Sequence, residues 1–287
     1  MKAFKFLYSS FIFLLCCFVS NAQTKTASPK GKLFIIGGGD RPPSLMKSLL
    51  NVTAMGPNDY AVVLPMSSEQ PDTSFYYFKV DFHSVSDKPL VNFNFTAQNV
   101  NDKQWLDSLQ HAKLIFITGG DQERFMKVVL NTPVYDAIHA AYHHGATIAG
   151  TSAGAAVMSK NMITGKEFTD TVYRATFRKL IHQNIEIKTG LGLLTNAVVD
   201  QHFIVRSRYN RLLSALALYP SLACIGIDEE TAIIVQGNKV KVTGSSQVIV
   251  MKNPTALKIT ANKLVKFSDI HLSIYTDGDK FLIGTGK

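Results

Sequence analysis

Cysteine is scarce in this sequence. Only Cys16, Cys17 and Cys224 occur among 287 residues, and the first two fall in an N-terminal segment that we expect to be removed. The mature chain would then keep Cys224 alone. A single cysteine excludes an internal disulfide and a metal site built from cysteines.

A hydrophobic run long enough to span a membrane is also lacking at the N-terminus. The run at residues 6–19 is about fourteen residues long, short of the roughly 20 that a bilayer requires. Lys2 and Lys5 lie before it, and small residues follow it up to Ala22. This order predicts a secretory signal peptide over residues 1–22, cleaved near Ala22, and then a polar lead-in over residues 23–31. The protein would be secreted or periplasmic, without stable membrane association; the alternative is an uncleaved anchor.

Positive charge is present but not clustered. The formal net charge is +9, and loss of Lys2 and Lys5 lowers it to +7. The rest is spread along the chain, without the basic clusters and interleaved aromatic residues of a nucleic-acid groove. We therefore expect acidic partners and no nucleic acid. No repeat or linker divides the chain, which predicts a single catalytic domain over residues 32–287.

Strands and helices alternate along the chain. Apolar runs at residues 33–36, 61–65 and 114–118 each end in a turn rich in Gly, Asp or Ser, and helices are predicted at residues 45–50 and 133–144. Such runs predict an α/β fold with a largely parallel sheet covered by helices on both faces. After residue 221, shorter strands such as those at 223–227 and 231–235 predict an antiparallel C-terminal extension. In such sheets, ligands bind at the carboxyl ends of the strands.

A G-x-S-x-G turn lies between a short strand and a helix. It contains Gly150, Ser152 and Gly154, and a strand is predicted before it and a helix after it. A sharp strand-to-helix turn exposes its central side chain at the edge of the sheet, which suits a nucleophile that attacks a carbonyl. The Ala153 N–H lies at the helix N-terminus, where negative charge is favoured. The alternative is an ordinary tight turn.

A serine nucleophile needs a base, and His202 is the best candidate. It follows an apolar run at residues 197–199, so it lies just past a strand end, on the same edge as Ser152. His139, His143 and His144 are assigned to the solvent face of the helix at residues 133–144. The orienting acid stays open between four carboxylates. These are Asp200, Asp228, Glu229 and Glu230. The order of serine before histidine before acid differs from that of α/β-hydrolases if the acid is one of the last three.

Four segments resemble those of cyanophycinases, within the dipeptidase E-like serine peptidases. They are residues 119–122, residues 150–158, residues 200–203 with the arginines after them, and residues 226–232. The resemblance runs from about residue 32 to at least residue 235. It implies a flavodoxin-like three-layer sandwich, similar to class I glutamine amidotransferases. Relatives cut cyanophycin, a polyaspartate that carries arginine on each β-carboxyl, and release β-aspartyl-arginine dipeptides.

The same resemblance implies roles for individual residues. The nucleophile, base and orienting acid fall on Ser152, His202 and Glu229, and the oxyanion donors on the N–H groups of Gly120 and Ala153. Positions that line the family's substrate cleft fall on Gln122, Asp200, Arg206, Arg208 and Arg211. Arginine suits the carboxylates of a polyaspartate because its planar fork binds them bidentately. The alternative for the three arginines is a solvated helix face. The resemblance also implies a homodimer, and the chemistry needs no metal or organic cofactor.

Residues 166–189 depart from the family pattern. This stretch is longer than expected and carries Arg174, Arg178, Lys179 and Lys188. We expect it to cover the rim of the active site, where substrate is selected. Its basic content does not suit the arginine side chains of cyanophycin, for which Glu69, Glu167 and Asp170 are the candidate acids. Two alternatives follow: a peptidase or esterase of this fold acting on another acidic or isoaspartyl substrate, and a catalytically silent exported binding protein.

Overall fold

The computed structural model describes residues 28–170, 172 and 174–284. The predicted signal peptide at residues 1–22 and most of the polar lead-in lie outside these residues. Within the described residues, no helix is long and apolar enough to cross a membrane.

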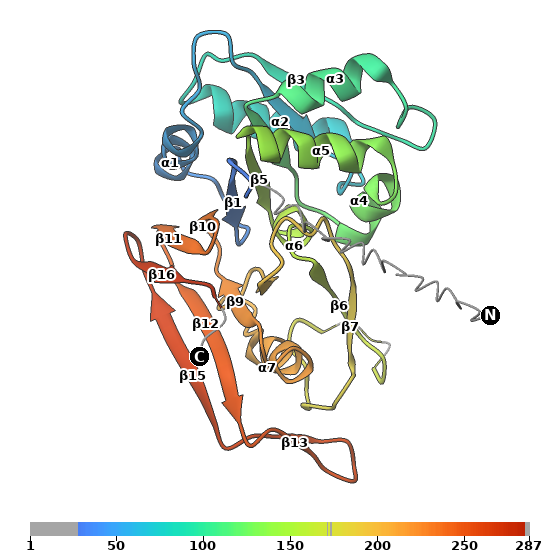
Figure 1. The fold of residues 1–287 in the computed structure, drawn as a ribbon, viewed down its shortest axis with the longest axis vertical. Helices are drawn as coiled ribbons and strands as arrows, with labels where there is room; N and C mark the ends of the chain where they lie inside the picture. The colour runs from blue at the N-terminus through green and yellow to red at the C-terminus, as the bar shows by residue number, and fades with distance from the viewer. Residues whose placement is uncertain (1–27, 171, 173, 285–287) are drawn as a thin grey trace, which may run out of the picture.

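An eight-stranded sheet forms the main body of the molecule (Figure 1). Five of its strands are parallel, in the order β3-β2-β4-β5-β1. They are β1 (Lys32–Ile36), β2 (Ala61–Leu64), β3 (Leu90–Asn92), β4 (Leu114–Ile117) and β5 (Thr147–Thr151). Antiparallel strands continue the sheet beyond β1. They are β10 (Thr231–Gln236), β11 (Lys239–Gly244) and β16 (Lys280–Leu282).

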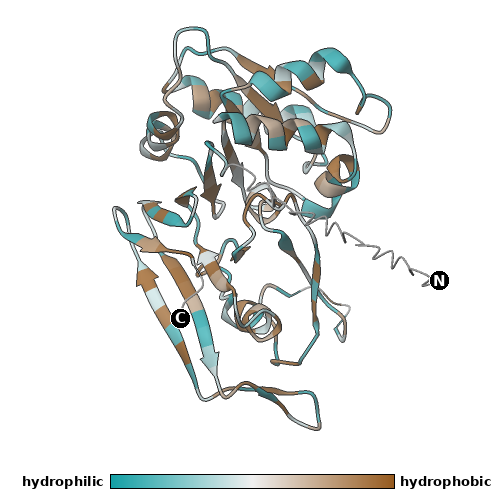
Figure 2. Cartoon of the chain, in the orientation of Figure 1, coloured by the Kyte–Doolittle hydropathy of each residue, from teal (hydrophilic) through white to brown (hydrophobic). Residues whose placement is uncertain are grey.

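Helices cover both faces of the parallel strands. Every residue of β2, β4 and β5 is buried as a result. One face packs on α1 (Pro43–Thr53) and α2 (Pro71–His83), where Phe78 stacks on Phe116. The other packs on helices that contribute Leu109, Phe125 and Val134 to the larger core. These helices are α3 (Lys103–His111), α4 (Gln122–Val129) and α5 (Pro133–His144). Figure 2 shows the hydrophobic sheet between helices whose outward residues are hydrophilic. The predicted α/β class with a largely parallel sheet is confirmed.

Helix α5 is bounded by Thr132 and Gly145, and it begins at Pro133. Gly145 has a left-handed conformation (φ 113°), and its N–H bonds back to the last turn. Thr132 occupies the N-cap position, yet its hydroxyl donates to the Val128 and Val129 carbonyls instead of accepting from the helix.

A second sheet separates from the first in the C-terminal half. Its order is β15-β12-β9-β8, and the β8–β9 pair is parallel. The strands are β8 (Ala197–Asp200), β9 (Ala223–Ile227), β12 (Val248–Thr255) and β15 (Asp269–Tyr275), with α7 (Tyr209–Leu218) packed on them. The antiparallel extension therefore divides between two sheets. The division occurs because β9 pairs with β12 through Ile225 and Ile227, while β10 pairs with β1.

A two-stranded ribbon packs beside the second sheet and α7, where Ile163 and Ile185 join their hydrophobic core. It consists of β6 (Asn161–Glu167) and β7 (Ile185–Thr189) and follows the short helix α6 (Ala153–Ala156). A smaller ribbon, β13 (Lys258–Ile259) with β14 (Val265–Lys266), lies further along the chain. Residues 166–189 comprise the end of β6, the loop that joins it to β7, and β7 itself. The first ribbon lies on the side of the molecule where β5 ends (Figure 1).

Candidate active site

Ser152 sits in a strained turn between β5 and α6. Its backbone angles are φ 53° and ψ −111°, outside the region that side chains with a Cβ prefer. The flanking glycines make the turn possible: a Cβ on Gly150 would lie 2.4 Å from the Gly154 carbonyl oxygen. A Cβ on Gly154 would lie 2.2 Å from the Ile117 carbonyl oxygen. The G-x-S-x-G pattern therefore reflects close packing of the turn on β4, which holds the serine side chain at the sheet edge.

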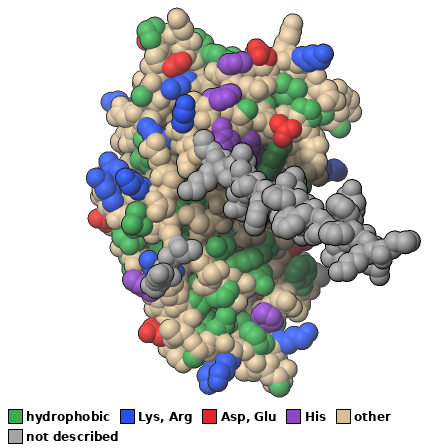
Figure 3. All heavy atoms as spheres, viewed as in Figure 1, with side chains coloured by type: hydrophobic (Ala, Val, Ile, Leu, Met, Phe, Trp, Pro, Cys, Tyr) green, Lys and Arg blue, Asp and Glu red, His purple; other side chains and the backbone are tan. Residues whose placement is uncertain are grey.

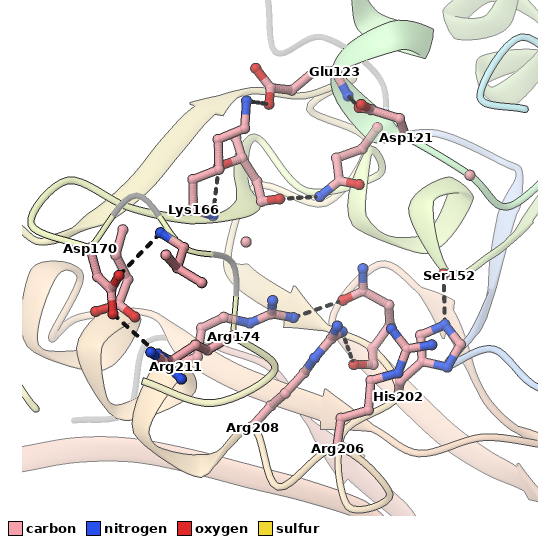
Figure 4. Close-up of a pocket in the computed structure, with 17 residues that line it drawn as sticks. Asp121, Glu123, Ser152, Lys166, Asp170, Arg174, His202, Arg206, Arg208 and Arg211 are labelled. Atoms are coloured by element: carbon pink, nitrogen blue, oxygen red, sulfur yellow. Dashed lines mark hydrogen bonds and ion pairs between the residues drawn. The ribbon is translucent and has the colours of Figure 1, made fainter. Parts of the chain in front are cut away.

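His202 joins Ser152 to Glu229. The Ser152 hydroxyl oxygen is 2.7 Å from His202 Nε2, and Glu229 Oε1 is 2.6 Å from His202 Nδ1 (Figure 4 shows the first contact). With a carboxylate accepting at Nδ1, that nitrogen carries the proton, and Nε2 accepts from the serine hydroxyl. The three side chains come from the turns after β5, β8 and β9. The second sheet thus delivers the base and its carboxylate to a serine on the first.

The other candidate acids have different partners. Asp228 accepts from the N–H groups of Ile204 and Val205, which shapes the turn after His202. Glu230 accepts from the Ser245 hydroxyl. Asp200 is fully buried and pairs with Arg211. Among the four carboxylates, only Glu229 reaches the imidazole in the described structure.

Gly38 and Gly39, which follow β1, pack directly against His202 and Glu229. A Cβ on Gly38 would lie 2.2 Å from His202 Cε1, and one on Gly39 would lie 2.7 Å from Glu229 Cβ. The His202 N–H donates to the Gly37 carbonyl oxygen at 2.7 Å. The sequence marked this segment only as a turn at a strand end. Its role in seating the base depends on contacts between segments more than 160 residues apart along the chain.

Two N–H groups beside Ser152 are available to an oxyanion. Ala153 is the first residue of α6, and its N–H has no acceptor among the described residues. The Gly120 N–H also lacks an acceptor there, and a Cβ on Gly119 would lie 3.5 Å from Ser152 Cβ. Gly120 has φ 135°, and a Cβ on it would lie 2.2 Å from the Ser67 carbonyl oxygen. The turn after β4 therefore requires glycine at this position.

Comparison with known proteins agrees with this geometry. The family model described as Peptidase family S51 matches residues 33–243. A cyanophycinase from Trichormus variabilis is 33% identical over 231 residues, which are 77% of this chain and 74% of that protein. The chain belongs to peptidase family S51. A cyanophycinase from Synechococcus elongatus is 27% identical over 282 residues, 93% of this chain and 84% of its own.

Solved structures show the same fold. A peptidase from an acI-B1 Actinobacterium superposes with a TM-score of 0.63 at 19% identity, covering 89% of this chain and 98% of its own. A putative peptidase E from Listeria monocytogenes gives 0.52 at 16% identity, covering 75% of this chain and 99% of its own. As a member of family S51, the protein is a serine-type peptidase.

The environment of His202 in the S51 peptidase favours its neutral form. Burial lowers the pKa of His202 below the ordinary value of 6.5, and the positive charges of Arg206 and Arg208 lower it further. The hydrogen bond with Glu229 opposes these effects without overcoming them. A neutral imidazole at neutral pH is the form that can take a proton from Ser152.

A cleft of about 560 Å³ opens beside Ser152 and His202, which we call the arginine cleft (Figure 4). Its walls come from the start of α4, the β6–β7 ribbon with its loop, and the segment after β8. The wall residues used below are Gln122, Glu167, Asp170, Arg174, Gln201, Arg206, Arg208 and Arg211. The expectation that residues 166–189 lie along the active-site rim agrees with this cleft, which Lys166, Glu167, Asp170 and Arg174 line.

The three arginines after His202 differ sharply in their surroundings. The Arg206 side chain is exposed and forms no hydrogen bond or ion pair within the described structure. Arg211 is 2% exposed and holds the fully buried Asp200 through two hydrogen bonds. Arg208 is also buried, donates to the Gln201 carbonyl oxygen at 2.6 Å and lies 3.6 Å from Asp200. The geometry makes Asp200 and Arg211 an internal ion pair beneath the cleft, and leaves Arg206 facing it.

Three other residues singled out in the sequence have contacts that the sequence did not reveal. Gln122 lines the arginine cleft, and its amide nitrogen donates to the Ile163 and Thr164 carbonyls at 2.9 Å each, tying α4 to β6. Glu69 pairs with Arg124 and does not line the cleft.

The assignment of His139 to the solvent face of α5 is wrong. His139 is half-buried and bonds to the Leu191 carbonyl oxygen at 2.8 Å. Its helical position faces the segment before β8, a contact that helix periodicity alone does not encode.

Proposed function

We propose that this S51 peptidase is an exported enzyme that hydrolyses cyanophycin to β-aspartyl-arginine dipeptides through an acyl-enzyme on Ser152. The hydrogen-bonded series Ser152–His202–Glu229 is the observation that carries the mechanism. The similarity to cyanophycinases supports the substrate. Arg206, exposed on the wall of the arginine cleft, suits the carboxylates of a polyaspartate backbone.

The first half of the reaction forms the acyl-enzyme. Nε2 of His202 takes the proton of the Ser152 hydroxyl as its oxygen bonds to the backbone carbonyl carbon of an aspartyl residue. The Gly120 and Ala153 N–H groups donate to the oxyanion. Glu229 holds the imidazole and stabilises its charged form. The carbon–nitrogen bond then breaks, and the leaving amine takes the proton from His202.

The second half consumes one water molecule. His202 takes a proton from the water as its oxygen bonds to the acyl carbon, and the ester bond to Ser152 breaks. The proton returns from His202 to the serine oxygen, and the carboxylic acid product leaves. The net change is hydrolysis of one peptide bond. The three side chains used in both halves lie in hydrogen-bond contact.

Export rests on the N-terminal sequence alone. The order of Lys2, Lys5, the apolar run and the small residues to Ala22 supports secretion or delivery to the periplasm. Its test is N-terminal sequencing of the protein purified from the cell envelope and from the medium. A first residue near Gln23 is expected, whereas a retained Met1 would contradict cleavage.

Product analysis tests the substrate. Residues 23–287 are incubated with cyanophycin, with a panel of β-aspartyl dipeptides and with simple esters, and the products are identified by mass spectrometry. Release of β-aspartyl-arginine from the polymer is expected. Cleavage restricted to β-aspartyl dipeptides or esters would favour the same fold acting on another acidic or isoaspartyl substrate. Absence of any cleavage, together with no labelling by a fluorophosphonate, would favour a silent binding protein.

A further inference from the structure

A second cleft meets the arginine cleft at the nucleophile. It has a volume of about 710 Å³, and Ser152 and His202 line both clefts, which share no other residue. The second cleft lies between the turn after β1 and helix α2. We call it the tyrosine cleft, and its residues used here are Asp40, Arg41, Tyr77, Asp81, Thr118 and Thr151. A substrate chain that crosses Ser152 would enter both clefts.

The carboxylates of the arginine cleft are already engaged. Burial alone raises the pKa of Glu123, but hydrogen bonds from Lys166 and Lys188 outweigh burial and lower it. Each of the other three has a partner of its own. Asp121 accepts from the N–H groups of Glu123 and Arg124, Glu167 accepts from Asn184, and Asp170 accepts from Arg174. Each carboxylate named here therefore has a hydrogen-bond donor, whereas the Arg206 side chain has no hydrogen bond or ion pair within the described residues.

The tyrosine cleft has the opposite character. Asp40 is exposed and has no hydrogen bond or ion pair within the described residues. Asp81 meets Arg41 through Oδ2 alone, at 2.8 Å and 2.6 Å, so its second oxygen remains available. Tyr77 is 60% exposed, which leaves most of its ring accessible. The unpaired charge here is negative, beside an aromatic ring.

Two buried hydroxyls in this cleft also lack partners. Thr118 and Thr151 are 2% and 5% exposed, and neither hydroxyl oxygen has a hydrogen-bond partner in the described structure. Both residues line the tyrosine cleft, and Thr151 directly precedes the nucleophile. A buried hydroxyl without a partner is costly, so these two groups favour a polar ligand at this place.

We propose that the tyrosine cleft binds a guanidinium side chain of the substrate, while the arginine cleft binds its carboxylate. Tyr77 would stack on the guanidinium plane, and Asp40 with the free oxygen of Asp81 would accept its hydrogen bonds. This assignment rests on the proposed function, since it names where the arginine of an aspartyl-arginine substrate goes. It also reconciles the basic residues 166–189 with a substrate that carries arginine, because that side chain is bound on the other side of Ser152.

Calorimetric binding to the Ser152→Ala protein tests the assignment, because the ligand is not consumed. The ligands are β-aspartyl-arginine and its citrulline counterpart, which is nearly isosteric but uncharged. We expect at least about tenfold tighter binding of the arginine peptide, from charge-assisted hydrogen bonds and ring stacking. Adding Asp40→Asn or Tyr77→Ala should reduce this ratio about three- to tenfold, while Tyr77→Phe, which keeps the ring, should preserve it. Asp72→Asn and Val80→Ala, exposed positions of α2 outside the cleft, are the matched controls and should change nothing.

An arginine preference that survives both Asp40→Asn and Tyr77→Ala would overturn the assignment, as would no preference at all. The altered side chains are exposed, so unchanged melting temperatures are expected and confirm that binding is compared in folded proteins. The proposed function fails separately: wild-type protein that leaves cyanophycin intact would refute it. An arginine preference that depends on Asp40 and Tyr77 would still establish the guanidinium site.

Discussion

The two clefts that meet at Ser152 are built from different parts of the chain and leave opposite charges unpaired. The arginine cleft, from α4, the β6–β7 ribbon and the segment after β8, satisfies its carboxylates and presents Arg206. The tyrosine cleft, from the turn after β1 and from α2, presents Asp40 and Tyr77. The charged side chains that lack partners therefore indicate the substrate better than the charge composition of each cleft does. On the face seen in Figure 3, the Lys and Arg side chains stand in several separate groups, so net charge alone locates no binding surface.

Removing the nucleophile should abolish turnover whichever cleft holds the substrate. Ser152→Ala is expected to lower kcat by about 10⁴- to 10⁶-fold on cyanophycin and on esters alike. Steady-state assays measure the loss, and circular dichroism checks that the fold is kept. Turnover within tenfold of the wild type would show that another group attacks the carbonyl.

Removing the carboxylate behind His202 should be the next largest effect. Glu229→Gln replaces the charged acceptor of the Nδ1 hydrogen bond with a neutral amide that can also present its NH2 group, so the imidazole loses its fixed tautomer and the stabilisation of its charged form. We expect kcat to fall about 10³- to 10⁴-fold with KM little changed. Glu230→Gln, one residue along and bonded to Ser245, is the matched control. Equal losses in the two variants would remove Glu229 from its proposed role.

Substitutions at Asp200 and Arg206 should show that the buried Asp200–Arg211 ion pair stabilises the fold, whereas the exposed Arg206 does not. Asp200→Ala leaves Arg211 buried without its carboxylate, and breaking such a pair costs about 3–5 kcal/mol of unfolding free energy. Arg206→Ala removes an exposed side chain and should change stability by less than about 0.5 kcal/mol. Chemical denaturation measures both. A small loss for Asp200→Ala would mean that the ion pair serves the substrate and not the fold.

Arg206 should matter for binding. Arg206→Gln is expected to raise KM on an aspartyl substrate about tenfold, since one charge-assisted hydrogen bond is lost, with kcat affected less. Lys241→Gln on β11, an exposed cation outside both clefts, should leave KM unchanged. An unaltered KM in Arg206→Gln would place the substrate carboxylate elsewhere.

The smallest expected effect is a shift of the pH profile. The neutral form of His202 is the base, so kcat/KM should fall as pH drops through its pKa, which burial holds below 6.5. The positive charge of Arg206 also lowers this pKa, so Arg206→Gln should raise it and move the acid limb to higher pH. Profiles of kcat/KM for the two proteins check this. A shift of the acid limb of the Arg206→Gln profile to lower pH would contradict this prediction.

Local patterns were sufficient to predict much of the fold. The strands at residues 33–36, 61–64 and 114–117 are buried on both faces, so their apolar runs carry the signal directly. The turn around Ser152 is equally local, because the clashes that require Gly150 and Gly154 arise within β4, β5 and α6. The second sheet was not foreseen, since a strand does not reveal from its own sequence which neighbour it pairs with.

The surroundings of charged residues were harder to predict. Arg206, Arg208 and Arg211 are alike in the sequence, yet two are buried and one is exposed, because only the turn between β8 and α7 decides which faces Asp200. The tyrosine cleft has no motif, as Asp40 and Tyr77 lie on separate elements that meet only in the folded chain. The seating of His202 on Gly38 is another contact of this kind.

The most direct test is to trap the acyl group on Ser152. The protein is mixed with an activated aryl ester of β-aspartyl-arginine, formed at the aspartyl α-carboxyl, and quenched with acid during turnover. Peptide mapping by mass spectrometry should find the acyl adduct on the tryptic peptide of residues 128–160, with fragmentation placing it on Ser152 and not Ser159. The Ser152→Ala protein should carry none. Turnover with no adduct there, or an adduct on another residue that Ser152→Ala preserves, would contradict the account.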